Sequence, residues 1–493
     1  MGAVLKTEME KLFGTDGIRG TVGEFPLVPD FVLRLGQAVG TILRRRSTSS
    51  SVVVGRDTRE SGPALQAALT AGLLATGVDV IDVGVISTPG VAALTRHLKA
   101  ATGIVISASH NPVEQNGIKF FNEVGQKLSA DIEDEIERLA AGPNAGWDAM
   151  KAIPRKRLGC LIEGAHFHEA YIRGLLSEHP ASFLDGINLV MDCGNGAAYK
   201  LAPEVFTRAG AVVRAVNSSP TGLNINADSG SEHVRREPKE MAEWIRKHGA
   251  DFGIAFDGDA DRVVFIDEHG KLVDGDHMLG VFALYLNKRK QLLAGTVVTT
   301  TMRNTGLKNY VESAGIKLEE TPVGDKYVIE RLIELRREFA GDGLLGLGGE
   351  QAGHLILLDD EHFTGDGMRT GLFFARVFRE SGAASLSAFA AEVGKTPQII
   401  ASAGAVDLPR LDKKQLAEME KTTLAETPGL IRANLRYSGT EPLFRVMLEC
   451  DNRVSGKELA ALAVKLCRRV QSEREIEEGT IDILDCTSGK ITL

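Results

Sequence analysis

Three aspartates follow one short apolar segment at alternate positions. Asp257, Asp259 and Asp261 come directly after Phe252–Phe256, which we expect to be a buried strand. Carboxylates at positions i, i+2 and i+4 of an extended loop point to the same side, and like charges that converge there repel one another unless a cation lies between them. Their hard oxygen atoms suit magnesium or calcium better than zinc. We therefore predict a divalent metal site, with a solvated acidic turn as the alternative.

The same segment resembles a calcium-binding EF-hand loop in one respect only. Counting from Asp257, the twelfth residue is Glu268, where such a loop carries its bidentate ligand. The sixth residue is Arg262 rather than the required glycine, and Val263–Ile266 is typical of a strand. These two features argue against an EF-hand.

A serine and a histidine follow a second apolar segment. Gly103–Ile106 is predicted to be a strand, and Ser109 and His110 lie in the loop between this strand and Pro112. A serine in such a loop can be held rigidly for chemistry, whereas the alternative is a simple turn that ends at an Asn-Pro pair. The segment lacks the Gly-x-Ser-x-Gly elbow of acyl-transfer enzymes. Lys119 lies close in sequence and could accept a proton or contact a phosphate.

Two further loops combine glycine with polar residues that suit a sugar phosphate. In 348–354 a flexible backbone allows Glu350 and His354 to approach a ligand, and a carboxylate can accept paired hydrogen bonds from sugar hydroxyls. The second loop spans 436–445, and the alternative for it is a surface turn with a salt bridge. This loop combines guanidinium groups, hydroxyls and a glycine turn, which suits a phosphate dianion: Arg436, Ser438, Gly439, Thr440 and Arg445.

The composition is that of an ordinary globular protein without a cationic surface. A chain of 493 residues is too long for one core and predicts two to four domains. The net charge of -9 gives no broad positive field for nucleic acid or for an anionic membrane. The five cysteines are scattered, which indicates neither a disulfide framework nor a zinc site. With no signal peptide and no apolar run long enough to cross a bilayer, we expect a cytoplasmic protein.

Three stretches share one strand–helix–strand pattern. They begin at Val52–Val54, Leu189–Met191 and Val297–Thr299, and in each a polar loop, a helix and a glycine precede a second strand. This spacing is typical of a βαβ unit. The basic run Arg44–Arg46 is interpreted as the C-terminal end of a helix, where cations are favourable. The last hundred residues differ, because alternating apolar positions and a helical pattern over 456–470 predict a smaller α+β domain.

Taken together, these loops resemble those of the α-D-phosphohexomutase superfamily over essentially the whole chain. The N-terminal segment Phe13–Gly20 matches the opening signature of that superfamily. The resemblance implies an α/β protein with four domains around a central cleft, namely three related α/β mixed-sheet domains and a C-terminal α+β domain of TATA-binding-protein-like shape. We set the bounds of the four domains at 1–162, 163–270, 271–393 and 394–493.

The resemblance also implies a role for each loop. Ser109 corresponds to the phosphorylated serine, which also ligates the metal, and the three aspartates correspond to ligands of one Mg²⁺ per active site. Glu350 and Gly353 fall in the sugar-binding loop, and the arginine-containing loop corresponds to the site of the non-reacting phosphate. Four residues match positions that assist proton transfer or contact the phosphoserine: Arg19, His110, Lys119 and His354. Arg262 is a further expected active-site residue.

The implied reaction is the isomerisation of a hexose phosphate. A phosphoserine passes its phosphoryl group to the sugar, and the resulting hexose bisphosphate, which also serves as the activator, returns the other phosphate to the serine. The expected partner is thus a small-molecule hexose phosphate, with neither nucleic acid nor membrane, and the resemblance is compatible with a homodimer. Closure of the C-terminal domain over the cleft is our hypothesis for the exclusion of water.

Several segments are most similar to the branch that interconverts glucosamine 6-phosphate and glucosamine 1-phosphate, a step that feeds amino-sugar nucleotide and cell-wall precursor synthesis. Ala352 replaces the usual serine of the sugar loop, and 224–230 matches the branch only approximately, so a phosphomannomutase/phosphoglucomutase is the main alternative. A phosphosugar-binding regulator without turnover and a phosphohydrolase are the alternatives from other classes. The segments that indicate the branch are 106–112, 116–121, 323–327 and 349–351.

Overall fold

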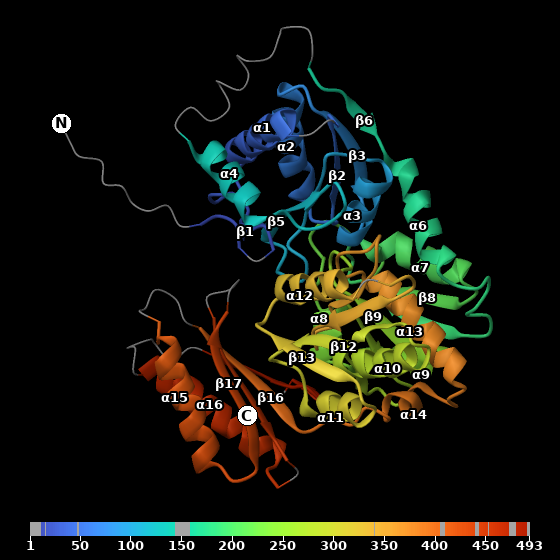
Figure 1. The fold of residues 1–493 in the computed structure, drawn as a ribbon, viewed down its shortest axis with the longest axis vertical. Helices are drawn as coiled ribbons and strands as arrows, with labels where there is room; N and C mark the ends of the chain where they lie inside the picture. The colour runs from blue at the N-terminus through green and yellow to red at the C-terminus, as the bar shows by residue number, and fades with distance from the viewer. Residues whose placement is uncertain are drawn as a thin grey trace, which may run out of the picture.

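Four β-sheets follow one another along the chain, each with its own helices (Figure 1). The predicted fold class, α/β with mixed sheets and a different C-terminal unit, is confirmed. In the part of the chain that the structure describes, no helix combines the length and the hydropathy of a membrane span. This computed structural model describes residues 11–14, 16–46, 49–142, 158–339, 341–404, 410–438, 443–451, 453–472 and 480–490.

The first sheet comes from the N-terminal third of the chain. Its strands are β1 (Ile18–Thr21), β2 (Ser51–Arg56), β3 (Asp79–Val85), β4 (Thr102–Ile106), β5 (Gln115–Asn122) and β6 (Leu161–Glu163). Their spatial order is β1-β5-β4-β2-β3-β6, with β2 parallel to β3 and β4, and β5 antiparallel to β4. Because β6 pairs with β3, this sheet reaches one residue beyond the bound that we set at 162.

Helices cover both faces of the first sheet. Val52 and Val54 of β2 pack into one core with α1 (Pro29–Arg46) and α2 (Gly62–Ala75), to which α4 (Ala130–Ala141) also contributes. Val53 faces the opposite core, which contains α3 (Thr88–His97). Two covered faces explain why consecutive positions of this strand are apolar. The arginine run at 44–46 ends α1, as predicted.

The second and third sheets are also mixed, with parallel pairs at one side and antiparallel pairs at the other. The second has the order β11-β10-β9-β7-β8 and consists of β7 (Asn188–Asp192), β8 (Val212–Val216), β9 (Phe252–Phe256), β10 (Val263–Ile266) and β11 (Leu272–Val273). The third has the order β13-β12-β14-β15 and consists of β12 (Leu292–Thr300), β13 (Lys317–Thr321), β14 (Leu345–Gly349) and β15 (Leu355–Leu358).

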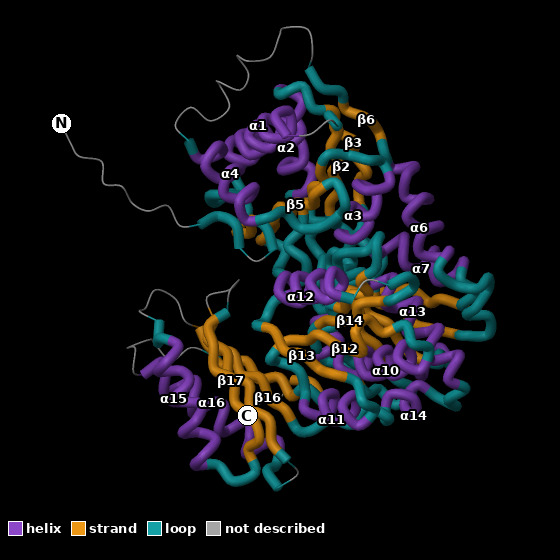
Figure 2. The backbone as a smooth tube through the Cα atoms, viewed as in Figure 1, coloured by secondary structure: helices purple, strands orange, loops and turns teal. Residues whose placement is uncertain are grey.

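The helices of these two units lie around the sheets (Figure 2). A short 3₁₀ turn at Ala165–Phe167 leads into the second unit, whose helices are α6 (His168–Ser177), α7 (Ala198–Arg208), α8 (Gly230–Arg236) and α9 (Lys239–His248). The third unit contains α10 (Gly275–Lys288), α11 (Thr305–Ser313), α12 (Asp325–Glu338), α13 (Gly367–Ser381) and α14 (Leu386–Ala390).

The three predicted βαβ units are all present. In each, two strands joined by a helix pair in parallel: β2 with β3, β7 with β8, and β12 with β13. The strands predicted at 252–256 and 263–266 have the same bounds in the structure. After α7 the chain turns at Gly210 with a φ of +104°, a conformation that favours glycine.

The second and third units share one hydrophobic core. Phe252 and Phe265 of the second sheet contact Phe378 and Phe374 of α13, with ring centroids 5.9 and 4.3 Å apart. Phe374 also contacts Phe282 of α10 at 6.1 Å. Because aromatic side chains bury large apolar areas, this cluster joins the two units and fixes the loops between them.

The C-terminal unit differs in topology and has its own core. Its sheet is antiparallel throughout, and α15 (Lys413–Glu426) and α16 (Gly456–Ser472) lie on one side of it (Figure 2). The predicted α+β character is confirmed. The strands are β16 (Gln398–Gly404), β17 (Leu430–Tyr437), β18 (Leu443–Cys450), β19 (Ile481–Asp485) and β20 (Gly489–Lys490), in the order β17-β18-β16-β19-β20.

Candidate active site

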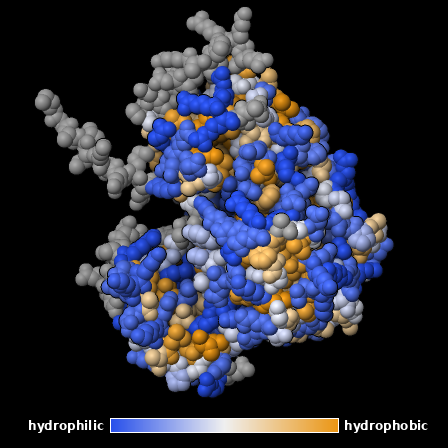
Figure 3. All heavy atoms as spheres, in the orientation of Figure 1, coloured by the Kyte–Doolittle hydropathy of each residue, from blue (hydrophilic) through white to orange (hydrophobic). Residues whose placement is uncertain are grey.

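One cavity of about 250 Å³ is lined by side chains from all four units. In the space-filling view the outline is indented on the left, between the N-terminal and the C-terminal unit (Figure 3). We call the cavity of about 250 Å³ the cleft. It brings together predicted site residues that lie far apart in the sequence: Arg19, His110, Asp261, Arg262, Glu350, His354, Arg436, Ser438 and Arg445.

Ser109 lies in a strained and tightly held loop after β4. Its φ is +54°, in the left-handed region, and the residue is only 1% exposed. A non-glycine residue in this conformation costs about 1–3 kcal/mol and persists only where the surroundings hold it. Its carbonyl accepts hydrogen bonds from Arg59 Nη2 at 3.0 Å and Asn226 Nδ2 at 2.8 Å, and its N–H donates to Ser107 Oγ at 2.9 Å. The loop is therefore pre-organised rather than a loose turn.

The hydroxyl of Ser109 faces the acidic cluster. Ser109 Oγ donates to Asp257 Oδ2 at 2.6 Å and lies 3.3 Å from His110 Nδ1. Burial and the nearby Arg262 guanidinium hold the pKa of His110 well below its ordinary value, so this imidazole is neutral. The serine oxygen thus lies between the carboxyl group of Asp257 and a neutral imidazole that can exchange a proton.

The three aspartates converge through a tight turn and not through the extended loop that we expected. Ala260 has a φ of +56°, and its N–H donates to Asp257 O at 3.1 Å. Three carboxylate oxygens, one each from Asp257, Asp259 and Asp261, all lie within 4.8 Å of one another. The turn therefore produces the predicted convergence by a different backbone path.

Two oxygens of this cluster suit a divalent cation. Asp259 Oδ1 and Asp261 Oδ1 are buried and have no hydrogen-bond partner among the residues that the structure describes. Burial, together with the charges of Asp261 and Asp259, raises the pKa of Asp257 well above its ordinary value. Buried carboxylate oxygens that lack donors, in a cluster of acids that repel one another, are the hard oxygen ligands that Mg²⁺ prefers. The residues present therefore fit the metal that the resemblance implies.

Lys119 is charged and is surrounded by carboxylates. Its Nζ lies 2.8 Å from Asp16 Oδ2, 2.8 Å from Asp259 Oδ2 and 3.5 Å from Asp261 Oδ2. Although burial opposes it, the carboxylates raise the pKa of Lys119, with Asp16 making the largest contribution among them. An ammonium cannot accept a proton, so this arrangement favours the phosphate-contact alternative for Lys119.

The loop at 348–354, between β14 and β15, is the predicted sugar loop. It packs directly against the loop that carries Asp257, Asp259 and Asp261, which we call the metal loop. Gly353 has a φ of +92°, and a Cβ at this position would lie 2.2 Å from Val263 O, so no larger residue fits there. His354 Nδ1 lies 3.8 Å from Asp261 Oδ2, and its Nε2 lies 3.7 Å from Asp325 Oδ2. Glu350 lines the cleft and accepts a hydrogen bond from Gly324 N at 3.1 Å. A bound sugar would therefore contact a loop held in register with the metal loop.

The predicted phosphate loop contributes two arginines from neighbouring strands. Arg436 of β17 and Arg445 of β18 are directly paired in the antiparallel register, which places both guanidinium groups on the same face of the sheet. Ser438 follows β17, and its N–H donates to Leu443 O at 2.8 Å. All three residues line the cleft, whereas Gly439 and Thr440 lie outside the described residues. Two paired guanidinium groups suit a phosphate dianion.

Three family models match the chain in sequence. They are described as phosphoglucomutase/phosphomannomutase alpha/beta/alpha domains I, II and III, and they match residues 10–145, 169–270 and 274–396. The chain belongs to the phosphohexomutase superfamily. This finding confirms the resemblance stated from the motifs.

Curated relatives of this phosphohexomutase are similar along almost the whole chain. It is 44% identical over 469 residues to the phosphoglucosamine mutase of Symbiobacterium thermophilum, covering 93% of this chain and 99% of that protein. It is 41% identical to the phosphoglucosamine mutase of Desulforamulus reducens, covering 92% and 97% of the two chains.

Solved structures share the fold of this phosphohexomutase. A phosphoglucomutase/phosphomannomutase family protein from Burkholderia thailandensis aligns with a TM-score of 0.72 at 23% identity, covering 94% of this chain and 97% of that one. A phosphoglucomutase from Paramecium, in an open form, aligns with a TM-score of 0.71 at 18% identity, covering 96% and 97%.

Several residues in the cleft of this phosphohexomutase were not predicted. Asp16 belongs to the N-terminal signature, which indicated a family but no role, and it pairs with Lys127 at 2.8 Å and with Arg19 at 2.7 Å. Although burial opposes it, Lys119 and Lys127 hold the pKa of Asp16 well below its ordinary value. Glu232 pairs with Arg235 of α8 at 2.7 Å, and both line the cleft. The sequence has no signal that reveals these ion pairs.

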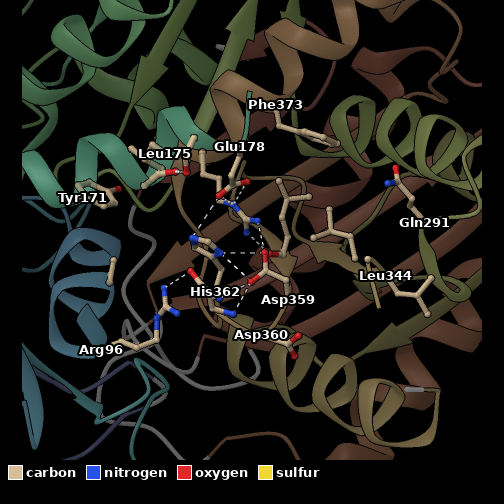
Figure 4. A pocket seen from close by; sticks show the side chains of 18 of the residues that line it. Arg96, Tyr171, Leu175, Glu178, Gln291, Leu344, Asp359, Asp360, His362 and Phe373 are labelled. Carbon is tan, nitrogen blue, oxygen red and sulfur yellow. Dashed lines mark hydrogen bonds and ion pairs between the residues drawn. The ribbon is translucent and has the colours of Figure 1, made fainter. Parts of the chain in front are cut away.

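A second cavity of this phosphohexomutase is larger, about 580 Å³, and lies between α3, α6 and α13. We call it the joint cavity. Its charged side chains pair with one another, and Figure 4 shows Glu178, Asp359 and His362 close together in its wall. Arg369, buried beside them, lies 2.8 Å from Glu178 Oε1 and 2.5 Å from Asp359 Oδ2. Arg96 pairs with Glu361 at 2.8 Å, which links the first unit to the third.

Proposed function

We propose that this chain is a phosphoglucosamine mutase, which interconverts glucosamine 6-phosphate and glucosamine 1-phosphate through a phosphoserine at Ser109. The observation that carries the proposal is the position of Ser109 Oγ, 2.6 Å from Asp257 in a cluster of three carboxylates beside the four-unit cleft. The substrate is proposed from the curated relatives, which are phosphoglucosamine mutases at 41–44% identity.

The aspartate cluster and its neighbours would hold the charge of the reacting phosphate. A phosphoserine carries about −1.5 to −2 charges, so a second phosphate can approach only if cations offset that charge. Asp257, Asp259 and Asp261 would hold Mg²⁺, which supplies charge neutralisation at the transferring oxygens when bound. Lys119 and Arg262 add two fixed positive charges next to the cluster.

The transfer itself needs few covalent contributions from the protein. A sugar hydroxyl oxygen attacks the phosphorus, the bond between phosphorus and Ser109 Oγ breaks, and the hydroxyl proton leaves as Oγ regains one. Phosphoryl transfer passes through a loose transition state, so positioning and charge stabilisation do most of the work. The neutral His110 imidazole, 3.3 Å from Oγ, is placed to exchange the proton at this oxygen.

The opposite wall of the cleft would hold the rest of the substrate. Arg436, Ser438 and Arg445 would bind the phosphate that does not react, and Glu350 would accept hydrogen bonds from sugar hydroxyls. The bisphosphorylated sugar would then turn over in the cleft and return its other phosphate to Ser109. Water must be excluded during this step, because otherwise the phosphoserine would be hydrolysed. A homodimer, a cytoplasmic location and the four domain bounds stay predictions.

An assay with several substrates tests the reaction and its selectivity together. The protein is incubated with Mg²⁺, a trace of hexose 1,6-bisphosphate, and the 6-phosphate of glucosamine, glucose or mannose, and the products are followed by ³¹P NMR. We expect the 1-phosphate of glucosamine to form fastest. Release of inorganic phosphate would indicate a phosphohydrolase, and an unchanged substrate would indicate a binding protein. Faster turnover of mannose or glucose phosphate would reassign the substrate.

Ala352 gives this assay a matched variant. The residue lines the cleft and offers no hydroxyl to the sugar. A hydrogen bond to a ligand contributes about 0.5–1.5 kcal/mol, so we expect Ala352→Ser to change the ratio of kcat/KM between hexose phosphates by about 2- to 12-fold. An unchanged ratio would show that this position does not contact the sugar.

A further inference from the structure

The metal loop is held between the N-terminal ends of two helices from other units. Thr88 N, at the start of α3, donates to Asp259 O at 2.9 Å, and Gly367 N, at the start of α13, donates to Ala260 O at 3.0 Å. The two consecutive carbonyls of the loop are thus fixed by the first and the third unit. Helix N-termini also favour nearby negative charge, which suits a loop that carries three carboxylates.

The two helix starts are themselves connected. Ser87, the N-cap of α3, donates to Tyr171 Oη at 3.3 Å, and Tyr171 Oη donates to Asp366 Oδ2 at 2.7 Å. Asp366 is the N-cap of α13, where its other oxygen accepts a hydrogen bond from Arg369 N at 3.0 Å. This buried series of hydrogen bonds keeps the starts of α3 and α13 in one position relative to the metal loop.

Thr88 also contacts the loop through its side chain. Thr88 Oγ1 donates to Asp259 Oδ2 at 2.5 Å, and the same oxygen accepts a hydrogen bond from Lys119 Nζ at 2.8 Å. Asp259 Oδ1 has no hydrogen-bond partner among the described residues. The two oxygens of one carboxylate are therefore distinguished, because one is saturated by two donors and the other is left for a cation.

We propose that Thr88 is a positioning residue for the metal site. Its hydroxyl and its backbone N–H together orient Asp259 so that Oδ1 faces the cation while Oδ2 stays bonded to Thr88 and Lys119. This inference rests on the proposed function only in taking Asp257, Asp259 and Asp261 as metal ligands. Removal of a partner that orients a metal ligand in this way typically lowers metal affinity by about 10- to 100-fold.

The test compares variants of two buried threonines on the same helix. Thr88→Val removes the hydroxyl and keeps the shape, whereas Thr88→Ser keeps the hydroxyl. The matched control is Thr95→Val, because Thr95 is buried on α3 and its Oγ1 donates within the helix, to Val91 O at 2.7 Å. Binding of Mn²⁺ to each metal-free protein is measured by electron paramagnetic resonance, on preparations whose phosphorylation is matched by intact mass. Thr88→Ala serves as the second variant if Thr88→Val does not fold.

We expect the Kd for Mn²⁺ to rise about 10-fold or more in Thr88→Val, and to stay within about 2-fold of the wild type in Thr88→Ser and Thr95→Val. Wild-type affinity in Thr88→Val, or in Thr88→Ala where it replaces that variant, would overturn the proposal, as would an equal loss in Thr95→Val. Asp259→Asn separates the hypothesis of a metal site from the hypothesis that Thr88 positions its ligand. If it leaves Mn²⁺ binding unchanged, the proposed metal site itself is wrong, whereas lost binding in Asp259→Asn with normal binding in Thr88→Val contradicts only the role of Thr88.

Discussion

The cleft and the joint cavity are both lined by acids and arginines that pair with one another, but the cleft also lies beside a cluster of acids that converge. In the joint cavity acids and arginines pair with one another, as Glu178 and Asp359 do with Arg369. Beside the cleft three acids converge, and two of their buried oxygens have no hydrogen-bond partner among the described residues. The joint cavity is more than twice as large as the cleft, about 580 against 250 Å³. Volume therefore does not distinguish the proposed active site from the joint cavity, whereas buried carboxylate oxygens without a hydrogen-bond donor do.

Among the variants that compare the two cavities, the largest expected effect comes from removing one charge of the acidic cluster. Asp257→Asn removes a proposed metal ligand and the carboxylate that accepts the hydrogen bond of Ser109 Oγ. We expect kcat to fall by roughly 10³-fold, because metal and electrostatic stabilisation supply most of the rate in phosphoryl transfer. Isomerisation of glucosamine 6-phosphate is the measurement. Asp360→Asn, at an exposed acid of the joint cavity, is the matched control and should keep the wild-type rate.

The next largest effect concerns stability and tests the joint cavity. Arg369→Met would leave Glu178 and Asp359 without their buried partner, and breaking a buried ion pair costs about 3–5 kcal/mol. We expect that loss in the free energy of unfolding by urea, with kcat and KM unchanged in the folded fraction. Arg376→Met, at a more exposed pair with Glu380, should cost less than about 1 kcal/mol. A variant Arg369→Met of normal stability that lost turnover would contradict the assignment of the two cavities.

A smaller effect is expected at the far wall of the cleft. Arg445→Ala removes one guanidinium of the pair that we propose binds the non-reacting phosphate. A charge-assisted hydrogen bond contributes about 1.5–3 kcal/mol, so we expect KM to rise about 10- to 150-fold with a smaller change in kcat. Arg453→Ala, at an exposed pair with Asp451 in the same unit, is the control. A fall in kcat at unchanged KM would place Arg445 at the reacting phosphate instead.

The smallest effect is a pH dependence of the metal-free protein. The pKa of Asp257 is raised in the folded state by burial and by its acidic neighbours, so the folded state binds its proton more tightly than the unfolded state does. The contribution of Asp257 to stability is therefore present below its unfolded pKa, near 4, and is lost as the pH rises towards the folded pKa.

Between these two pKa values the free energy of unfolding of the wild type should fall by about 1.4 kcal/mol per pH unit relative to that of Asp257→Asn, in which this group does not titrate. Urea unfolding of both proteins in EDTA at several pH values measures this difference. A difference that does not vary with pH would contradict the proposed repulsion. Adding Mg²⁺ at 100 times its Kd should stabilise only the wild type, by about 2.7 kcal/mol.

The sequence predicted the local elements that carry the chemistry, because each has a local signal. The strands before Ser109 and Asp257 are apolar and end at polar residues, and the three βαβ repeats follow from strand and glycine spacing. The turn at Ala260 could not be predicted, because alternate aspartates fit an extended loop equally well. The contacts between units could not be predicted either. Thr88 and Lys127 belong to no motif, the motif that contains Asp16 indicates no role for it, and the roles of all three depend on how the first unit docks on the others.

The most direct test of the account is the covalent state of Ser109. The protein is incubated with glucose 1,6-bisphosphate and Mg²⁺, its intact mass is measured, and the modified residue is located by peptide mapping. We expect one phosphate per chain, on Ser109, and in Ser109→Ala neither the phosphate nor any isomerisation, a loss of roughly 10⁴-fold or more. A phosphate on another residue, or wild-type turnover in Ser109→Ala, would contradict the claim that this serine carries the phosphoryl group.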